Sequence, residues 1–245
     1  MSKSLANQIA VVTGASSGIG RAIALALAAE GAALFLVARR ENALSAVAQT
    51  IRAADEQARV WSCPTDLSQE TDIQRLGTAI ERETGCLDIL VHCGGAYSSG
   101  RISEATTTSF DSLYQTNVRG PFLLTKIALP LFPRGSGQIV FINSSAGLSA
   151  RAGHGQFAAS QHALRAVTDA LREEINSHGT RVLSMHLGRT ATPRMERLYD
   201  QGAKPYRPEL LMQPEDVAAT VRAALLLPRT AEITEIHMRP LLKSY

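Results

Sequence analysis

A glycine-rich segment near the amino end has the chemistry needed to bind phosphate. Residues 13–20 read TGASSGIG and lie between a short apolar run and a helical pattern. In such a strand–turn–helix unit, Gly14 permits a tight turn, Gly18 lets the backbone approach a pyrophosphate and Gly20 permits close helix packing. The helix start adds free N–H groups and the positive end of its dipole. These properties predict a phosphate site formed by Gly14, Ser16, Ser17, Gly18, Ile19 and Gly20.

A basic side chain follows the second apolar run and bears on which dinucleotide binds. A site for NAD usually places an acidic residue there, which binds the ribose 2′-hydroxyl. This chain has Ala38 at that place and Arg39 next to it. The forked guanidinium of arginine suits a 2′-phosphate, so we expect NADP(H) to be favoured over NAD(H). The alternative is that Arg39 and Arg40 are solvated residues at the start of the next helix.

Alternating strands and helices must position these residues. Apolar runs predict strands at 9–12, 34–37, 59–61, 87–91, 138–142, 182–185 and 233–238. Helical patterns cover 18–30, 41–54, 70–83, 110–132, 155–177 and 214–227, with an interruption expected at Gly120-Pro121. Continuously apolar strands indicate a parallel sheet covered by helices on both faces. The sequence therefore predicts one α/β domain over residues 1–245, of the Rossmann-like doubly wound class. Residues 190–214 have weak periodicity and are expected to form a mobile substrate or lid segment.

Composition narrows the classes of function. The 245 residues are 45% hydrophobic and 19% charged, with a net charge of +3, which fits a globular domain with a real core. The basic residues are scattered, so no nucleic-acid partner is expected. No segment reads as a signal peptide or a membrane span. The three cysteines have no metal-binding spacing, so we expect no metal site and a reduced, cytoplasmic protein.

The spacing of the glycine segment, together with motifs along almost the whole chain, resembles the short-chain dehydrogenase/reductase family. The resemblance implies a seven-stranded parallel sheet with helices on both sides, and a homodimer or homotetramer formed through the helices near residues 110–132 and 155–177. The sequence His92-Cys93-Gly94-Gly95 stands where the family usually has Asn-Asn-Ala-Gly. We expect His92 to be structural and Cys93 to be a buried, inert thiol. By family position, further cofactor contacts are expected from Asp66, Leu67, Cys93, Gly94, Gly188, Thr190 and Thr192.

The family's catalytic pair is replaced in this chain. Members use a tyrosine as proton donor or acceptor, a lysine four residues later, and a serine thirteen residues before the tyrosine. Counting from Ser144 places Phe157 at the tyrosine position and Gln161 at the lysine position, while Asn117 matches the family's asparagine. Phenylalanine has no transferable proton, and glutamine carries no charge that would lower a neighbour's pKa. Ser144 and Asn117 could instead have structural roles, with Ser144 capping a turn and Asn117 stabilising a bend in its helix.

Other side chains could supply the missing proton. His154 precedes the helix that carries Phe157, and Tyr97 follows the fourth strand, so both are candidates. His162 is expected to point about 140° away from Phe157 on a helix of 3.6 residues per turn. Tyr199 and Tyr206 lie in the segment expected to act as a lid.

Three functions remain open from the sequence. The first is an NADP(H)-binding protein that is weak or inactive as a dehydrogenase and acts as a cofactor sensor or partner subunit. The second is an active NADP(H)-dependent oxidoreductase for a carbonyl or alcohol, with a non-standard proton donor. The third is an altered version of an active enzyme. All three bind a nicotinamide dinucleotide, and the small-molecule substrate or ligand is not readable from the motifs.

Overall fold

The computed structural model describes residues 3–202 and 205–242, and these form one parallel sheet covered on both faces. The strands lie in the order β3-β2-β1-β4-β5-β6-β7. Their bounds are β1 Ile9–Thr13, β2 Ala33–Ala38, β3 Val60–Pro64, β4 Ile89–His92, β5 Gln138–Ser144, β6 Arg181–Leu187 and β7 Glu235–Met238. The predicted Rossmann-like, seven-stranded fold is confirmed. The strand order reverses between β1 and β4, where such folds bind their ligands beyond the strand ends.

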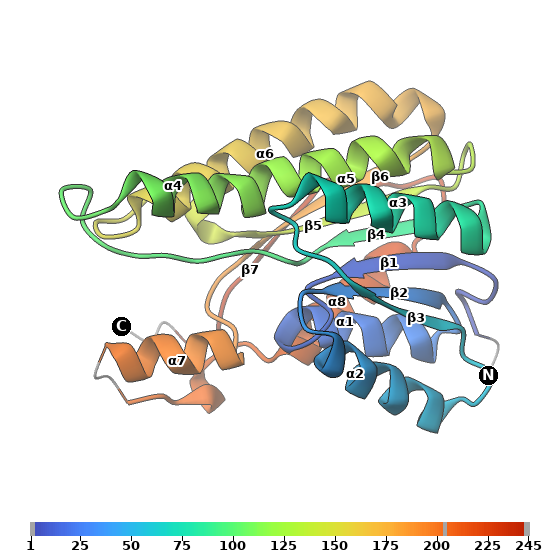
Figure 1. Cartoon of the computed structure of the whole chain (residues 1–245), viewed down its shortest axis with the longest axis horizontal. Helices are drawn as coiled ribbons and strands as arrows, with labels where there is room; N and C mark the ends of the chain where they lie inside the picture. Colours follow the sequence, from blue (N-terminus) through green and yellow to red (C-terminus); the bar gives the residue numbers. More distant parts are fainter. Residues whose placement is uncertain (1–2, 203–204, 243–245) are drawn as a thin grey trace.

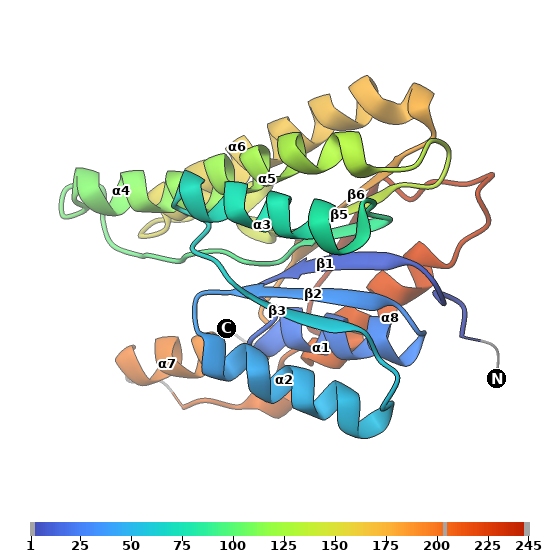
Figure 2. The same ribbon diagram turned by 45° about the vertical axis from the view of Figure 1, so that its right-hand side comes forward.

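Two helical layers enclose the sheet (Figures 1 and 2). One layer consists of α1 Gly18–Ala29, α2 Glu41–Ala54 and α8 Pro214–Leu225. The other consists of α3 Glu70–Thr84, α4 Thr107–Tyr114, α5 Gly120–Ala128 and α6 Gly155–Ile175. The remaining helix, α7 Pro193–Gln201, lies beyond the carboxyl ends of the strands (Figure 1).

The apolar strands divide their side chains between two cores. In β1, Ala10 and Val12 belong to the core under α1, α2 and α8, whereas Ile9 and Val11 belong to the core under α3, α5 and α6. This division follows from the two-residue repeat of a strand, and it explains why both faces of each central strand must be apolar. The sheet is therefore a rigid platform for the loops at its carboxyl end.

The helix expected over residues 110–132 begins earlier and is not broken at Gly120-Pro121. It starts at Thr107, where the Thr106 hydroxyl accepts a hydrogen bond from the Ser109 N–H. The irregularity is instead a π-helical turn at Gln115–Arg119, directly before α5. A side chain at Gly120 would place its Cβ 2.3 Å from the carbonyl oxygen of Leu67. Glycine is therefore required because this helix crosses the loop after β3 at close range.

The segment 190–214 is more regular than its periodicity predicts. It contains the nine-residue helix α7 and a 3₁₀ turn at Pro208–Leu210. The Thr192 hydroxyl caps α7 by accepting from the Met195 N–H, and Thr190 pairs with Met212 in an isolated bridge. Residues 203–204 of this segment lie outside the described residues. Among the helices that are described, none has the length and hydropathy needed to cross a membrane.

Candidate cofactor and active site

One large cleft of about 1680 Å³ runs along the carboxyl ends of the strands. It collects every side chain and glycine that the sequence singles out for the cofactor or for catalysis. The predicted residues that line it are Gly14, Ser16, Ser17, Gly18, Ile19, Gly20, Arg39, Asp66, Leu67, Cys93, Gly94, Asn117, Ser144, Phe157, Gln161, Gly188, Thr190 and Thr192. Placement in a common cleft is a geometric result, and the individual roles of these residues stay predictions.

The turn between β1 and α1 has the shape that a phosphate requires. Gly14 and Gly18 have φ values of +69° and +53°, which favour glycine. A Cβ at Gly20 would lie 2.3 Å from the Gly14 carbonyl oxygen, so this glycine lets the helix start pack against the turn. The Ser17 side chain makes no capping hydrogen bond to α1. The first N–H groups of α1 are therefore left for an anion in the cleft.

A buried threonine joins the two strands at the reversal of strand order. The Thr13 hydroxyl accepts hydrogen bonds of 2.9 Å from the N–H groups of Cys93 and Gly94, and donates to the Val91 carbonyl at 3.3 Å. A Cβ at Gly94 would lie 2.7 Å from the Leu67 side chain. Small residues are therefore needed where β4 ends and the cleft begins.

His92 and Cys93 have the surroundings of structural residues. The His92 Nε2 lies 2.8 Å from the Thr125 hydroxyl, and its ring stacks on Phe141 at 4.6 Å. Burial lowers the pKa of His92 to about 3 and raises the pKa of the Cys93 thiol to about 12. A neutral, stacked imidazole and a protonated thiol have no evident part in acid–base or nucleophilic chemistry at neutral pH.

The cleft is strongly basic. Its lining includes one carboxylate among the described residues, that of Asp66. Arg194, which the sequence reading missed, donates a hydrogen bond to the Gly95 carbonyl, and burial lowers its pKa. The signal for it was its place two residues after Thr192, at the start of α7. The arginines that line the cleft are Arg39, Arg40, Arg151, Arg189, Arg194, Arg197 and Arg207, an excess that suits the phosphates of a dinucleotide.

The candidate chemical end lies where β5 meets α6. The Ser144 hydroxyl accepts a 3.1 Å hydrogen bond from the Ala146 N–H, so it caps the 3₁₀ turn Ser145–Gly147. It still has its own O–H to donate. Phe157 and Gln161 stand one turn apart on α6 and both line the cleft. Gln161 is largely buried but lines the cleft, and its side-chain amide makes no hydrogen bond within the described residues.

Asn117 holds three parts of the structure together. Its side-chain oxygen accepts from the Ala96 N–H at 2.7 Å, and its amide donates to the Ala96 carbonyl and to the Ser160 hydroxyl, both at 3.0 Å. The π-helical turn is thereby tied to the loop after β4 and to α6. Because these hydrogen bonds occupy the Asn117 side chain, only the main chain of this residue would be available to take part in proton transfer.

A tyrosine and a histidine meet beside Phe157. The Tyr97 hydroxyl lies 2.9 Å from His154 Nδ1, and the Tyr97 ring contacts the edge of Phe157 at a centroid distance of 4.9 Å. Both polar side chains line the cleft. His162 does not line it, and its Nδ1 lies 2.9 Å from the Ala158 carbonyl, as its helical position predicts. The two candidate proton donors are therefore one hydrogen-bonded pair, which the sequence alone did not show.

Known proteins resemble this chain over nearly its full length. A family model described as short chain dehydrogenase matches residues 8–202. An uncharacterized oxidoreductase of Staphylococcus aureus is 30% identical over 237 residues, which are 96% of this chain and 98% of that protein. A glycine betaine reductase of Emericella nidulans is 34% identical over 96% of this chain, and the chain spans only 19% of that protein.

Solved structures give the same result. A metagenomic short-chain oxidoreductase in complex with NADP is 30% identical, with a TM-score of 0.83 over 98% of this chain and 100% of that one. The chain therefore belongs to the short-chain dehydrogenase/reductase family.

Proposed function

We propose that this protein binds NADP(H) in the cleft and is weak or inactive as an ordinary dehydrogenase. The observation that carries the proposal is the contrast between the two ends of the cleft. The phosphate end keeps its glycine turn, the free helix N-terminus and Arg39. The chemical end presents Phe157 and Gln161, which have neither a transferable proton nor a charge. This contrast favours a role as a cofactor-binding protein or partner subunit, and we expect that role in the cytoplasm.

The residues present fit the dinucleotide. The N–H groups at the start of α1 would hold its pyrophosphate, and Arg39 would bind the 2′-phosphate. One oxygen of Asp66 accepts from the Ser68 N–H and hydroxyl at 2.9 and 2.8 Å, which fixes the carboxylate at the edge of the cleft. The preference for NADP(H) is supported by Ala38 and Arg39, and by the related oxidoreductase whose structure contains NADP.

The absence of the family's tyrosine and lysine limits the rate of carbonyl reduction that we expect. The nicotinamide, when bound, supplies or accepts a hydride. The Ser144 O–H would orient a carbonyl oxygen in the cleft, but Phe157 has no proton to give to that oxygen. General acid–base help contributes about 10²–10⁴ in rate, so its loss removes ordinary turnover while leaving cofactor binding in place.

A second function is favoured by the hydrogen bond between Tyr97 and His154. A phenol O–H that faces the cleft could protonate a carbonyl oxygen, and His154 could return the proton to it. The Tyr97 and Phe157 rings are in contact, so this phenol would lie beside the position that we assign to the family's tyrosine. The protein would then be an active NADP(H)-dependent oxidoreductase for a carbonyl or alcohol.

One set of measurements separates the two functions. The purified protein is titrated with NADPH and with NADH, and then screened against carbonyl compounds by nicotinamide absorbance. Binding of NADPH without turnover supports the first function. Turnover that falls about a hundredfold or more in Tyr97→Phe, but not in the control Tyr114→Phe at an exposed position outside the cleft, supports the second. Failure to bind either dinucleotide overturns both.

A further inference from the structure

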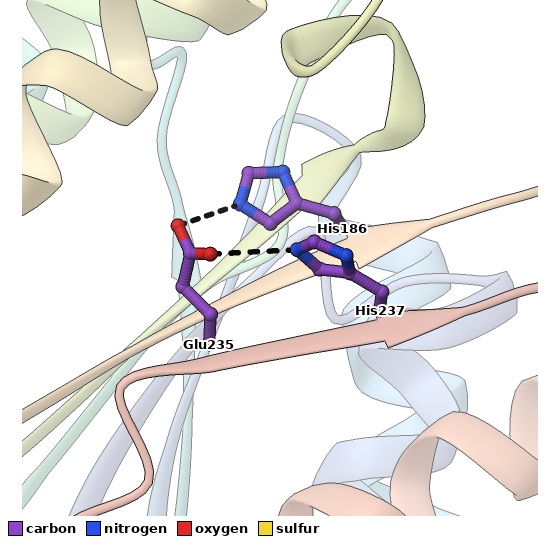
Figure 3. A group of neighbouring side chains, drawn as sticks. All are labelled: His186, Glu235 and His237. Carbon is purple, nitrogen blue, oxygen red and sulfur yellow. Dashed lines mark ion pairs between the residues drawn. The ribbon is translucent and has the colours of Figure 1, made fainter.

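Two neighbouring strands bring three metal-ligating side chains together outside the cleft (Figure 3). The side chains are His186 on β6, and Glu235 and His237 on β7. The register pairs His186 with His237 and Ser184 with Glu235. Because alternate residues of a strand share one face, all three side chains project from the same face of the sheet. The sequence reading missed this cluster, although Glu235 and His237 have the spacing of two residues on one strand face.

We propose that His186, Glu235 and His237 form a binding site for a divalent transition metal, with zinc as its best-suited ion. His186 Nε2 lies 3.6 Å from one carboxylate oxygen, and His237 Nε2 lies 3.4 Å from the other. One donor atom from each residue fits within 4.8 Å of the others. Tetrahedral zinc with bonds of about 2.0–2.2 Å spaces neighbouring ligand atoms roughly 3.4 Å apart. Each histidine nitrogen already stands near that spacing from one carboxylate oxygen, and a bound ion would need to draw the three donors slightly closer together.

The type of donor selects the class of metal. Two imidazoles and one carboxylate suit zinc and its transition-metal neighbours, whereas magnesium and calcium prefer oxygen ligands. Three protein ligands would leave a fourth position for water, because His237 is 56% exposed at the edge of the sheet. The His186 side chain, in contrast, has no exposed surface, so its position is fixed by packing.

Neighbouring groups hold two of the proposed ligands, His186 and Glu235, in position. His186 Nδ1 faces the Ser144 main-chain carbonyl at 3.5 Å, and metal-bound histidines commonly direct their second nitrogen at such an oxygen. Arg165 Nη2 lies 3.2 Å from Glu235 Oε1 and holds the carboxylate in place. The guanidinium also competes with a metal for that oxygen, so we expect weaker binding than at a closed four-ligand site.

The position of the cluster gives the metal a structural effect. Within the part of the chain that the structure describes, β7 is the last strand of the sheet and pairs with β6 alone. A metal would cross-link these two strands, and through His186 it would brace the end of β5 at Ser144. We therefore expect zinc to raise the melting temperature of the protein. This expectation does not depend on whether the cleft catalyses a reaction, because none of the three ligands lines it.

The test is a zinc titration of the full chain without an affinity tag, after treatment with a chelator. We expect one equivalent of zinc to bind and the melting temperature to rise. His237→Ala and Glu235→Gln should each weaken binding by about tenfold or more, whereas His178→Ala, which removes an exposed histidine elsewhere, should not. Cobalt should give visible absorption without a thiolate charge-transfer band, which would exclude cysteine ligands.

Two results would overturn the proposal. The first is the absence of saturable zinc binding below about 100 µM, corresponding to a very weak site. The second is equal zinc affinity in the unmodified protein and His237→Ala, with both proteins folded by circular dichroism. In either case the three side chains form an ion-paired cluster with Arg165, and zinc has no site there.

Discussion

Replacing Phe157 with tyrosine and Gln161 with lysine puts a proton donor and a charge on the cleft side of α6. The two positions are four residues apart, so the new side chains lie on the same helix face. The Gln161 carbonyl accepts a 3.2 Å hydrogen bond from the Asn143 side chain, which holds this turn of α6 against the end of β5 beside Ser144. The introduced lysine would therefore lie near the serine that is to orient the substrate oxygen.

The expected gain follows from the chemistry restored. General acid–base help corresponds to about 10²–10⁴ in kcat/KM, or about 3–5 kcal/mol of activation free energy. The structural cost should be small at Phe157, because its ring is half-buried and borders the cleft. At Gln161 the substitution breaks no hydrogen bond made within the described residues, but it places an ammonium in a buried position. We expect a loss of about 1–3 kcal/mol in the free energy of unfolding without cofactor.

The assay compares the unmodified protein, both single variants and the double variant at equal NADPH occupancy. Carbonyl reduction is followed by nicotinamide absorbance. Each single variant should recover less than about a tenth of the gain, because the two groups act as a unit. The reasoning would be refuted if the unmodified protein already turns over at the rate of the double variant. Tyr97→Phe and His154→Ala would then identify the donor in use.

Three further results are expected. Arg39→Ala should reduce the preference for NADPH over NADH by about 1–3 kcal/mol in fluorescence titrations, whereas the control Arg134→Ala, at an exposed position outside the cleft, should not. An unchanged ratio in Arg39→Ala would remove Arg39 from the 2′-phosphate site. Because burial lowers the pKa of His92 to about 3, the unfolded chain binds a proton that the folded chain does not as pH falls below 6.5. The free energy of unfolding should therefore fall by about 1.4 kcal/mol for each unit of pH lowered between about pH 6.5 and pH 3. In His92→Asn, the free energy of unfolding, measured with urea at a series of pH values, should depend less steeply on pH. Light scattering should give a homodimer or homotetramer. Phe122→Glu should weaken this association, because Phe110 and Phe122 expose aromatic rings on α4 and α5. A monomeric mass for the unmodified protein would contradict the prediction.

The strands and the glycine turn could be predicted because their signals are local. A buried parallel strand reads as a continuous apolar run, and the turn at residues 13–20 needs only glycines at fixed offsets. The π-helical turn had no such signal. It arises where Asn117 bonds to Ala96 and Ser160 and where Gly120 crosses the Leu67 carbonyl, and these are contacts between segments far apart in the chain. The sequence predicted the disturbance at Gly120-Pro121, directly after the turn that the structure has at Gln115–Arg119.

Contacts between distant segments also explain which features of the site could not be predicted from the sequence. The sequence gives Tyr97 and His154 as separate candidates, because nothing local shows that the loop after β4 reaches the start of α6. The pairing of His186 with His237 depends on the register of two strands that are about fifty residues apart. That Phe157 and Gln161 share one face of α6 was predictable, because a helix brings residues four apart onto the same face. Their match to the family's tyrosine and lysine positions stays a prediction.

The two ends of the cleft are built from different elements, which lets cofactor binding and proton transfer vary separately. The start of α1 and the end of β2 form the phosphate end, whereas β5, α6 and the loop after β4 form the chemical end. Phe157 contacts Tyr97, which belongs to the same end, so its change to tyrosine should leave the dissociation constant of NADPH unchanged. Gln161 is more buried than Phe157 and its amide makes no hydrogen bond within the described residues, so its change should alter cofactor affinity as well as rate. Unequal effects of these two substitutions on binding would therefore separate the residue that faces the substrate from the residue that faces the cofactor.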